Sequence, residues 1–146
     1  MEENSLLILL GNQLFPVEAI ESAKSDLVFM AEDHGLCTYE RHHKLKILMF
    51  LAAMREKRDE LALRGLSVEY SDINSQAFEQ SYEEKLLACV EKHNVKTIKI
   101  FEIEDKDFES RIKGFAETEG LNLIVLQSPM FLLERKEFLL FNGCLL

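Results

Sequence analysis

The tripeptide Gly11-Asn12-Gln13 contains the first residues along the chain that could bind a ligand, and it directly follows the short apolar run Leu6–Leu10. Glycine permits a tight turn and close approach of the backbone to a ligand, and the two amides that follow both donate and accept hydrogen bonds. Glu32 stands in the equivalent place after a second apolar run, where its carboxylate can accept a hydrogen bond. A solvated loop acid beside Asp33 explains Glu32 equally well.

Further candidates for ligand binding lie on a long helical pattern later in the chain. Tyr39 carries a ring that can stack and a hydroxyl, His43 and Lys46 carry nitrogen groups, and Phe50 adds a second ring. Each has a structural alternative, because a tyrosine at a helix start often packs as a cap and surface cations commonly pair with nearby acids. We predict a binding site that combines these residues with Gly11, Asn12, Gln13 and Glu32.

The sequence contains no motif that predicts a catalytic site. The serines and cysteines lie in no nucleophile elbow, and no glycine pattern for phosphate binding is present. His42 and His43 would point about 100° apart on a helix, which is unfavourable for sharing one metal ion. The acids from Glu102 to Asp107 could bind a cation, but they fit the solvated first turn of a helix better, because the helix dipole favours negative charge there. We therefore predict no catalytic residue and no metal site.

The elements that position these residues alternate between strand and helix patterns. Apolar runs bounded by turn signals predict strands at Leu6–Leu10, Leu27–Met30, Leu66–Tyr70, Thr97–Phe101 and Leu121–Leu126. Helical patterns lie near Pro16–Ala23, Tyr39–Arg64, Glu79–His93 and Asp107–Glu119, and Gly65 and Gly120 follow two of them where a C-cap glycine is expected. The alternation predicts an α/β fold, a Rossmann-like three-layer sandwich with a five-stranded parallel sheet. Ligands bind such sheets beyond the carboxyl ends of the strands, at the point where strand order reverses.

Composition limits the domain count, the partners and the compartment. The 146 residues, 47% of them hydrophobic, predict a single domain over residues 1–130. The 26 acidic against 17 basic residues give a net charge of −9, which argues against direct nucleic-acid binding. The first apolar run is too short to cross a membrane and follows two glutamates, so we predict neither a membrane span nor a signal peptide. Three widely spaced cysteines support neither a disulfide nor a zinc site, and we expect a reducing cytoplasm.

Two apolar surfaces in the sequence need cover. From Leu45 to Arg55 the apolar side chains point in every direction around the helix, so a sheet on one side leaves the other for a ligand, a partner chain or a further domain. Burial between neighbouring helices explains that pattern equally well. Ten of the sixteen residues 131–146 are apolar, which predicts a truncation, a linker remnant or a segment that dimerises. We expect a homodimer to form through these surfaces unless a further domain covers them.

Three stretches of the chain resemble a known family. They are Leu9-Leu10-Gly11-Asn12-Gln13-Leu14, then Thr38-Tyr39 followed by Arg41-His42-His43-Lys44, and Ala53-Met54-Arg55. From Leu6 to about Phe138 the sequence is similar to the amino-terminal domain of deoxyribodipyrimidine photolyase-related proteins, bacterial iron–sulfur relatives of photolyases and cryptochromes. The resemblance implies a Rossmann-like domain that in some members holds a ribityllumazine antenna pigment. It also implies a helical carboxy-terminal half, not contained in this sequence, that binds FAD and a four-iron cluster and acts in DNA repair.

Two departures from the family pattern bear on pigment binding. Asn12 stands where the family usually has aspartate, and Phe50 stands where relatives tend to have a smaller aliphatic residue. The phenyl ring would either stack on a pigment or fill its place. We expect a pigment-binding domain that is not catalytic by itself. The alternatives are an interaction or dimerisation module of the same fold without a ligand and, after it, a free-standing nucleotide-binding protein.

Overall fold

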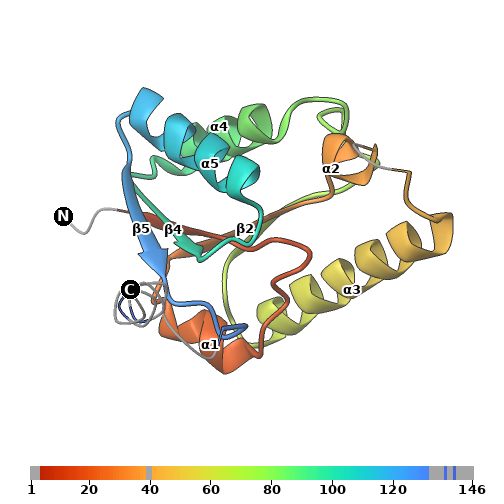
Figure 1. Ribbon diagram of the computed structural model, residues 1–146, viewed down its shortest axis with the longest axis horizontal. Helices are drawn as coiled ribbons and strands as arrows, with labels where there is room; N and C mark the ends of the chain where they lie inside the picture. The colour runs from red at the N-terminus through yellow and green to blue at the C-terminus, as the bar shows by residue number, and fades with distance from the viewer. Residues whose placement is uncertain (1–3, 39–40, 132–136, 138–139, 141–146) are drawn as a thin grey trace.

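The sheet is the centre of the structure, a computed structural model that describes residues 4–38, 41–131, 137 and 140 (Figure 1). Its strands are β1 (Ser5–Ile8), β2 (Leu27–Ala31), β3 (Val68–Ser71), β4 (Thr97–Phe101) and β5 (Asn122–Leu126). All of them run parallel, in the order β3-β2-β1-β4-β5. The predicted five-stranded parallel sheet is therefore confirmed, and the strand order reverses between β1 and β4.

Helices cover both faces of this sheet. They are α1 (Val17–Ser22), α2 (His34–Thr38), α3 (Lys44–Leu63), α4 (Tyr82–His93) and α5 (Lys106–Thr118). In Figure 1, α4 and α5 lie above the sheet, and α1 and α3 lie below it. This arrangement confirms the predicted Rossmann-like three-layer α/β/α sandwich. No helix among the described residues has the length and apolar character needed to cross a membrane.

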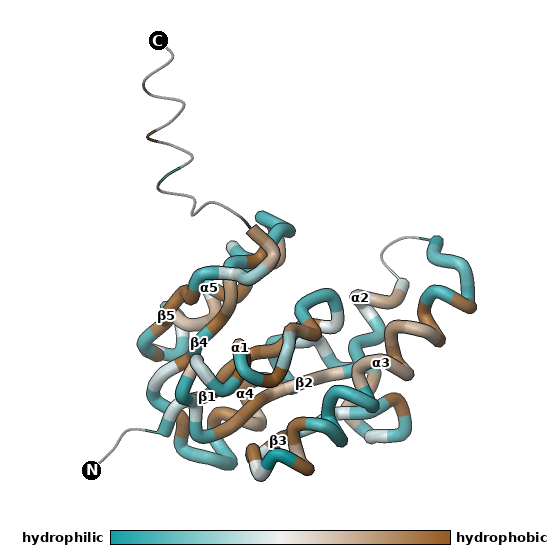
Figure 2. The backbone as a smooth tube through the Cα atoms, turned by 90° about the horizontal axis from the view of Figure 1, so that it is seen from below, coloured by the Kyte–Doolittle hydropathy of each residue, from teal (hydrophilic) through white to brown (hydrophobic). Residues whose placement is uncertain are grey.

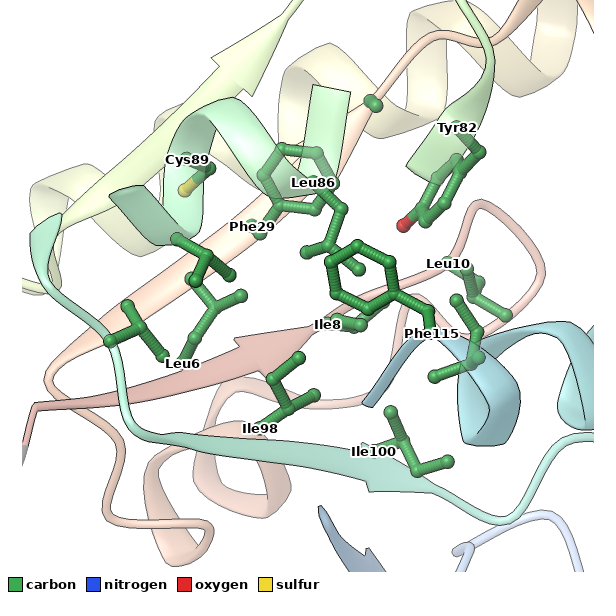
Figure 3. Close-up of a cluster of buried hydrophobic side chains, with 14 of the residues drawn as sticks. Leu6, Ile8, Leu10, Phe29, Tyr82, Leu86, Cys89, Ile98, Ile100 and Phe115 are labelled. Carbon is green, nitrogen blue, oxygen red and sulfur yellow. The ribbon is translucent and has the colours of Figure 1, made fainter. Parts of the chain in front are cut away.

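The inner strands are apolar at nearly every position because both of their faces are covered. Every residue of β1 and β2 is buried, and Figure 2 shows β2 as a hydrophobic stretch inside the molecule. Leu6 and Ile8 point into the core under α4 and α5, where they meet residues such as Leu86 (Figure 3). Leu7, one position along, joins the opposite core with Ile20 of α1. Such continuous burial is typical of parallel sheets and explains why these strands could be predicted from short apolar runs.

Capping residues next to the helices determine where several of them begin and end. Gly65 and Gly120 follow the C-cap residues Arg64 and Glu119 of α3 and α5 and have φ values of 84° and 65°, so their predicted role in ending these helices is confirmed. Ser81 and Glu84 form a capping box at the start of α4.

The predicted helix Tyr39–Arg64 begins too early. Residues 41–43 are not helical, because His43 is the N-cap of α3 and its Nδ1 accepts a hydrogen bond from the Leu45 backbone N–H. The short helix α2, which was not predicted, precedes this segment. Tyr39 itself, and most of the predicted apolar segment 131–146, lie outside the described residues.

A buried ion pair ties the end of β2 to α4. Asp33 follows β2, and its Oδ2 lies 2.8 Å from the Lys85 ammonium, with both side chains almost fully buried. The same ammonium donates to the Phe78 carbonyl oxygen at 3.0 Å. Removing one member of such a pair leaves a charge in a poorly solvated place, which costs far more than the pair contributes when intact.

We expect Lys85→Met to lower the free energy of unfolding by about 3 kcal/mol, because Asp33 stays buried without that ammonium. Urea denaturation followed by circular dichroism measures the change. The double variant Lys85→Met/Asp33→Leu should recover most of the loss, since it removes both charges. If Lys85→Met alone were as stable as the unmodified chain, the stabilising role of the Asp33–Lys85 ion pair would be contradicted.

Candidate functional site

A cavity of about 350 Å³ lies beyond the carboxyl ends of the strands, where the strand pattern predicts a ligand site. We call it the strand-end cavity. Its walls come from the segments that follow β1, β2 and β4, from α2 and α3, and from the first turns of α4 and α5. The lining residues are Leu9, Leu10, Gly11, Asn12, Ala31, Glu32, Asp33, Cys37, His42, Lys46, Ile47, Phe50, Leu51, Met54, Tyr82, Ile103, Glu104, Asp105 and Phe108. Its volume falls within the range of small-molecule sites, roughly 300 to 1,000 Å³.

The loop after β1 contributes to the cavity wall through two of its three predicted residues. Gly11 and Asn12 line the cavity. A Cβ added at Gly11 would lie 2.9 Å from Met54 Sδ and 3.7 Å from Phe50 Cδ1, so a larger residue there would require the Met54 side chain to move. Gln13 is buried instead, and its Nε2 donates to the Glu102 carbonyl oxygen at 3.0 Å. Gln13 therefore ties the loop to the end of β4 and does not line the cavity.

Glu32 lines the cavity, but its carboxylate is engaged by the protein itself. Oε1 accepts from Arg55 Nε at 2.6 Å and from the Tyr70 hydroxyl at 2.7 Å, and Oε2 accepts from Arg55 Nη2 and the Ile73 backbone N–H, both at 2.9 Å. The side chain is 0% exposed. Glu32 thus anchors α3 and the segment after β3 to the end of β2.

Burial and hydrogen bonding have opposite effects on the pKa of the Glu32 carboxyl group. Burial raises the pKa of Glu32, but the hydrogen bonds from Arg55, Tyr70 and Ile73 outweigh it, so the pKa lies below its ordinary value. Burial and the neighbouring carboxylate raise the pKa of the Tyr70 hydroxyl, which stays a neutral donor. The cluster is therefore charged on Glu32 and Arg55 and neutral on Tyr70 at pH 7.

The N-terminal half of α3 forms one wall of the strand-end cavity and extends beyond the sheet (Figure 1). Lys46 and Phe50, both predicted, line the cavity, whereas His43 does not line it and caps the helix. Ile47, Leu51 and Met54 also line the cavity, although they were not among the predicted site residues. Their spacing from Phe50 places them on the same helical face, so helical periodicity alone could have found them.

Other lining residues could be found only with the topology. Tyr82 and Phe108, which lie in the first turns of α4 and α5, reach the cavity from the opposite side of the sheet, and their rings pack edge to face with centroids 5.2 Å apart. Asp105 is the N-cap of α5, where its Oδ1 accepts from the Asp107 and Phe108 backbone N–H groups. Cys37 also lines the cavity, and burial, with the Asp33 and Glu32 carboxylates, raises the pKa of its thiol. No cluster of three or more metal-ligating side chains occurs among the described residues.

Comparison with known proteins identifies the family. The family model for deoxyribodipyrimidine photo-lyase-related proteins matches residues 7–143. This chain belongs to that family. The chain is also 27% identical over 138 residues to the (6-4) photolyase of Agrobacterium fabrum (strain C58 / ATCC 33970). That match covers 92% of this chain and 27% of the relative, so the chain spans about a quarter of the relative's length.

A solved structure is also similar to this photolyase-related chain. It is a protein from the universal stress protein family from Burkholderia pseudomallei, with a TM-score of 0.41 and 10% sequence identity over 84% of this chain and 96% of that chain.

The stretch Ala53-Met54-Arg55, which carries part of the resemblance to photolyase-related proteins, has a structural role at the cavity. Met54 packs against Gly11, and Arg55 forms the ion pair with Glu32. These two contacts position the helix that forms the cavity wall.

We expect Glu32→Gln to lower the free energy of unfolding by about 2 kcal/mol at pH 7, because a charge-assisted pair with the partly exposed Arg55 is lost. The folded-state pKa of Glu32 lies below the ordinary 4.5. Its charge therefore stabilises the fold above pH 4.5, and this contribution is lost as the pH falls through the lowered value. Urea titrations of both proteins between pH 7 and pH 3 measure the difference. A difference that grows toward acid pH would contradict the assignment.

Gly11→Ala should lower the free energy of unfolding by about 1 kcal/mol, since the added methyl group displaces the Met54 side chain. Gly114→Ala is the matched control, because a Cβ there meets nothing within 4 Å in the interior of α5. That control should be as stable as the unmodified chain or more so, because alanine favours helix. Thermal melts compare the three proteins. Equal melting temperatures for Gly11→Ala and Gly114→Ala would show that the close approach of Met54 to Gly11 does not restrict the residue type at position 11.

Proposed function

We propose that this chain is the amino-terminal, antenna-pigment-binding type of domain of a photolyase-related protein that acts in DNA repair or light response. We also propose that the domain is not catalytic by itself. The observation that supports the binding function most is the strand-end cavity, which lies at the reversal of strand order in a chain of this family. The proposed ligand is a ribityllumazine, a flat heterocycle with a polar sugar-alcohol chain.

The wall of the strand-end cavity fits such a ligand chemically. Ile47, Phe50 and Leu51 on α3 and Phe108 on α5 offer apolar surface for the faces of a planar ring. Asn12 offers an amide that can donate to and accept from ring edges or hydroxyl groups, and the exposed Lys46 adds a cationic donor. When bound, the pigment would supply light absorption and pass excitation to a flavin held elsewhere in the protein.

The polar groups of the cavity support a binding role over a catalytic one. Glu32 is held by Arg55 and Tyr70, and Asp33 is paired with Lys85. The raised pKa of Cys37 keeps its thiol protonated and therefore poorly nucleophilic. These groups fix the wall, and Asn12 and Lys46 are exposed lining residues that could contact a ligand directly. We assign FAD and iron–sulfur binding, by the same proposal, to the part of such proteins that this chain does not span.

A ligand-free interaction module remains the second candidate function. The observation that favours it is a set of exposed apolar side chains on α3, on the face turned away from the cavity. Phe50, which is larger than the usual family residue, would then fill the space that a pigment occupies in relatives.

We expect the purified chain to bind ribityllumazine with a shift in visible absorbance and a rise in fluorescence anisotropy. Phe50→Ala should weaken binding about tenfold if the ring stacks on the pigment, and Asn12→Asp tests the family's usual carboxylate. Leu63→Ala, on the same helix but 89% exposed and distant from the cavity lining, is the control and should bind normally.

Two outcomes would decide against pigment binding by this chain. Binding by Phe50→Ala and Asn12→Asp but not by the unmodified chain would show that these two residues close the cavity. No binding by any of the proteins would overturn the proposal in favour of the interaction module.

A further inference from the structure

Tyr82 carries a buried hydroxyl group without a partner in the fold. The side chain is 1% exposed, and its hydroxyl makes no hydrogen bond to any part of the chain that the structure describes. Leaving a buried donor unpaired costs free energy, because the group loses its hydrogen bonds to water and gains none in return. Most buried hydroxyl groups in native proteins have a partner, so an unpaired one requires an explanation.

Packing explains the ring of Tyr82 but not its hydroxyl. The ring packs edge to face against Phe29 and Phe108, with centroid distances of 5.7 Å and 5.2 Å. Both contacts use the ring alone, and a phenylalanine at this position would make them equally well. The same contacts hold the ring inside the core under α4 and α5, which keeps the hydroxyl away from solvent.

Tyr82 lies at the boundary between this core and the strand-end cavity. It is the first residue of α4, and it belongs both to the core cluster and to the cavity wall. Figure 3 shows its side chain reaching from α4 into the cluster, on the side where Leu10 lies. Leu10, Ile103 and Phe108 also belong to both the cluster and the wall, and none of them has a polar side-chain atom. A molecule bound in the cavity is therefore the available source of an acceptor for Tyr82.

The surroundings of Tyr82 keep its hydroxyl protonated. Burial raises the pKa of Tyr82, and the Asp33 carboxylate raises it further. The group is therefore a neutral hydroxyl at pH 7 and can donate one hydrogen bond. An uncharged acceptor, such as a carbonyl oxygen or a ring nitrogen, matches this donor.

We infer that the Tyr82 hydroxyl donates a hydrogen bond to the ligand of the strand-end cavity and selects a ligand whose inserted ring edge carries an acceptor. This inference rests on the proposed function, because it concerns the same cavity. A ribityllumazine has carbonyl oxygens and ring nitrogens on one edge and a hydroxylated chain elsewhere. Its carbonyl edge then lies against Tyr82, and its chain lies nearer to Asn12 and Lys46, which are the exposed polar residues of the wall. Tyr82 thus determines the orientation of the ligand.

Tyr82→Phe tests the inference, because it removes the hydroxyl and keeps the ring. Calorimetric titration with ribityllumazine should show binding about tenfold weaker than to the unmodified chain. Without ligand, the melting temperature of this variant should equal or exceed that of the unmodified chain, since no hydrogen bond within the protein is lost. Tyr70→Phe is the matched comparison for stability. It removes the same atom, but the Tyr70 hydroxyl donates to Glu32 at 2.7 Å, so its melting temperature should fall.

The outcomes separate this inference from the proposed function. If Tyr82→Phe binds ribityllumazine as tightly as the unmodified chain, the role of the hydroxyl is overturned and the proposed function stands. A lower melting temperature for Tyr82→Phe without ligand would show that the hydroxyl has a partner in the protein, which also overturns the inference. No binding by the unmodified chain would overturn the proposed function and this inference together.

Discussion

Two consecutive buried carboxylates at the end of β2 connect the sheet to helices on both of its faces. Successive residues at a strand end point to opposite sides, so Glu32 reaches Arg55 on α3 and Asp33 reaches Lys85 on α4. Each carboxylate is buried and therefore stable as an anion only with its partners in place. A shift of either helix would separate one of these carboxylates from its cationic partner and leave a buried charge unpaired. The two ion pairs therefore fix the positions of both helices.

The strand-end cavity follows from this constraint. Only the C-terminal half of α3 packs closely on the sheet, through Met54, Leu61 and the Arg55 ion pair. The N-terminal half extends beyond the strands, so its inner face closes a cavity and its outer face meets solvent. This geometry explains why the apolar residues between Leu45 and Met54 lie on all sides of α3. The inner face lines the cavity of the proposed ligand, and the outer face is exposed to solvent.

Sequence patterns predicted the parts of the fold that depend on local order. The buried strands, the glycines at φ above zero and the loop Gly11-Asn12 all follow from short runs or single residue types. Features that depend on long-range pairing could not be predicted. Glu32 looked like a free acceptor because Arg55, 23 positions away, gives no sequence signal of the contact. Gln13 turned inward for a similar reason, since its partner Glu102 lies 89 positions away. His43 became a cap because the helix starts later than its apolar pattern suggested.

Nuclear magnetic resonance of the isotope-labelled chain during addition of ribityllumazine tests the proposed site most directly. Amide shifts should change for Gly11, Asn12 and the lining residues of α3, with small effects elsewhere. A second, smaller hollow of about 160 Å³ beside β3 and α4, lined in part by Glu69, Cys89 and Lys92, provides an internal comparison. Changes confined to that hollow, or spread evenly over the surface, would contradict the assignment of the strand-end cavity as the ligand site.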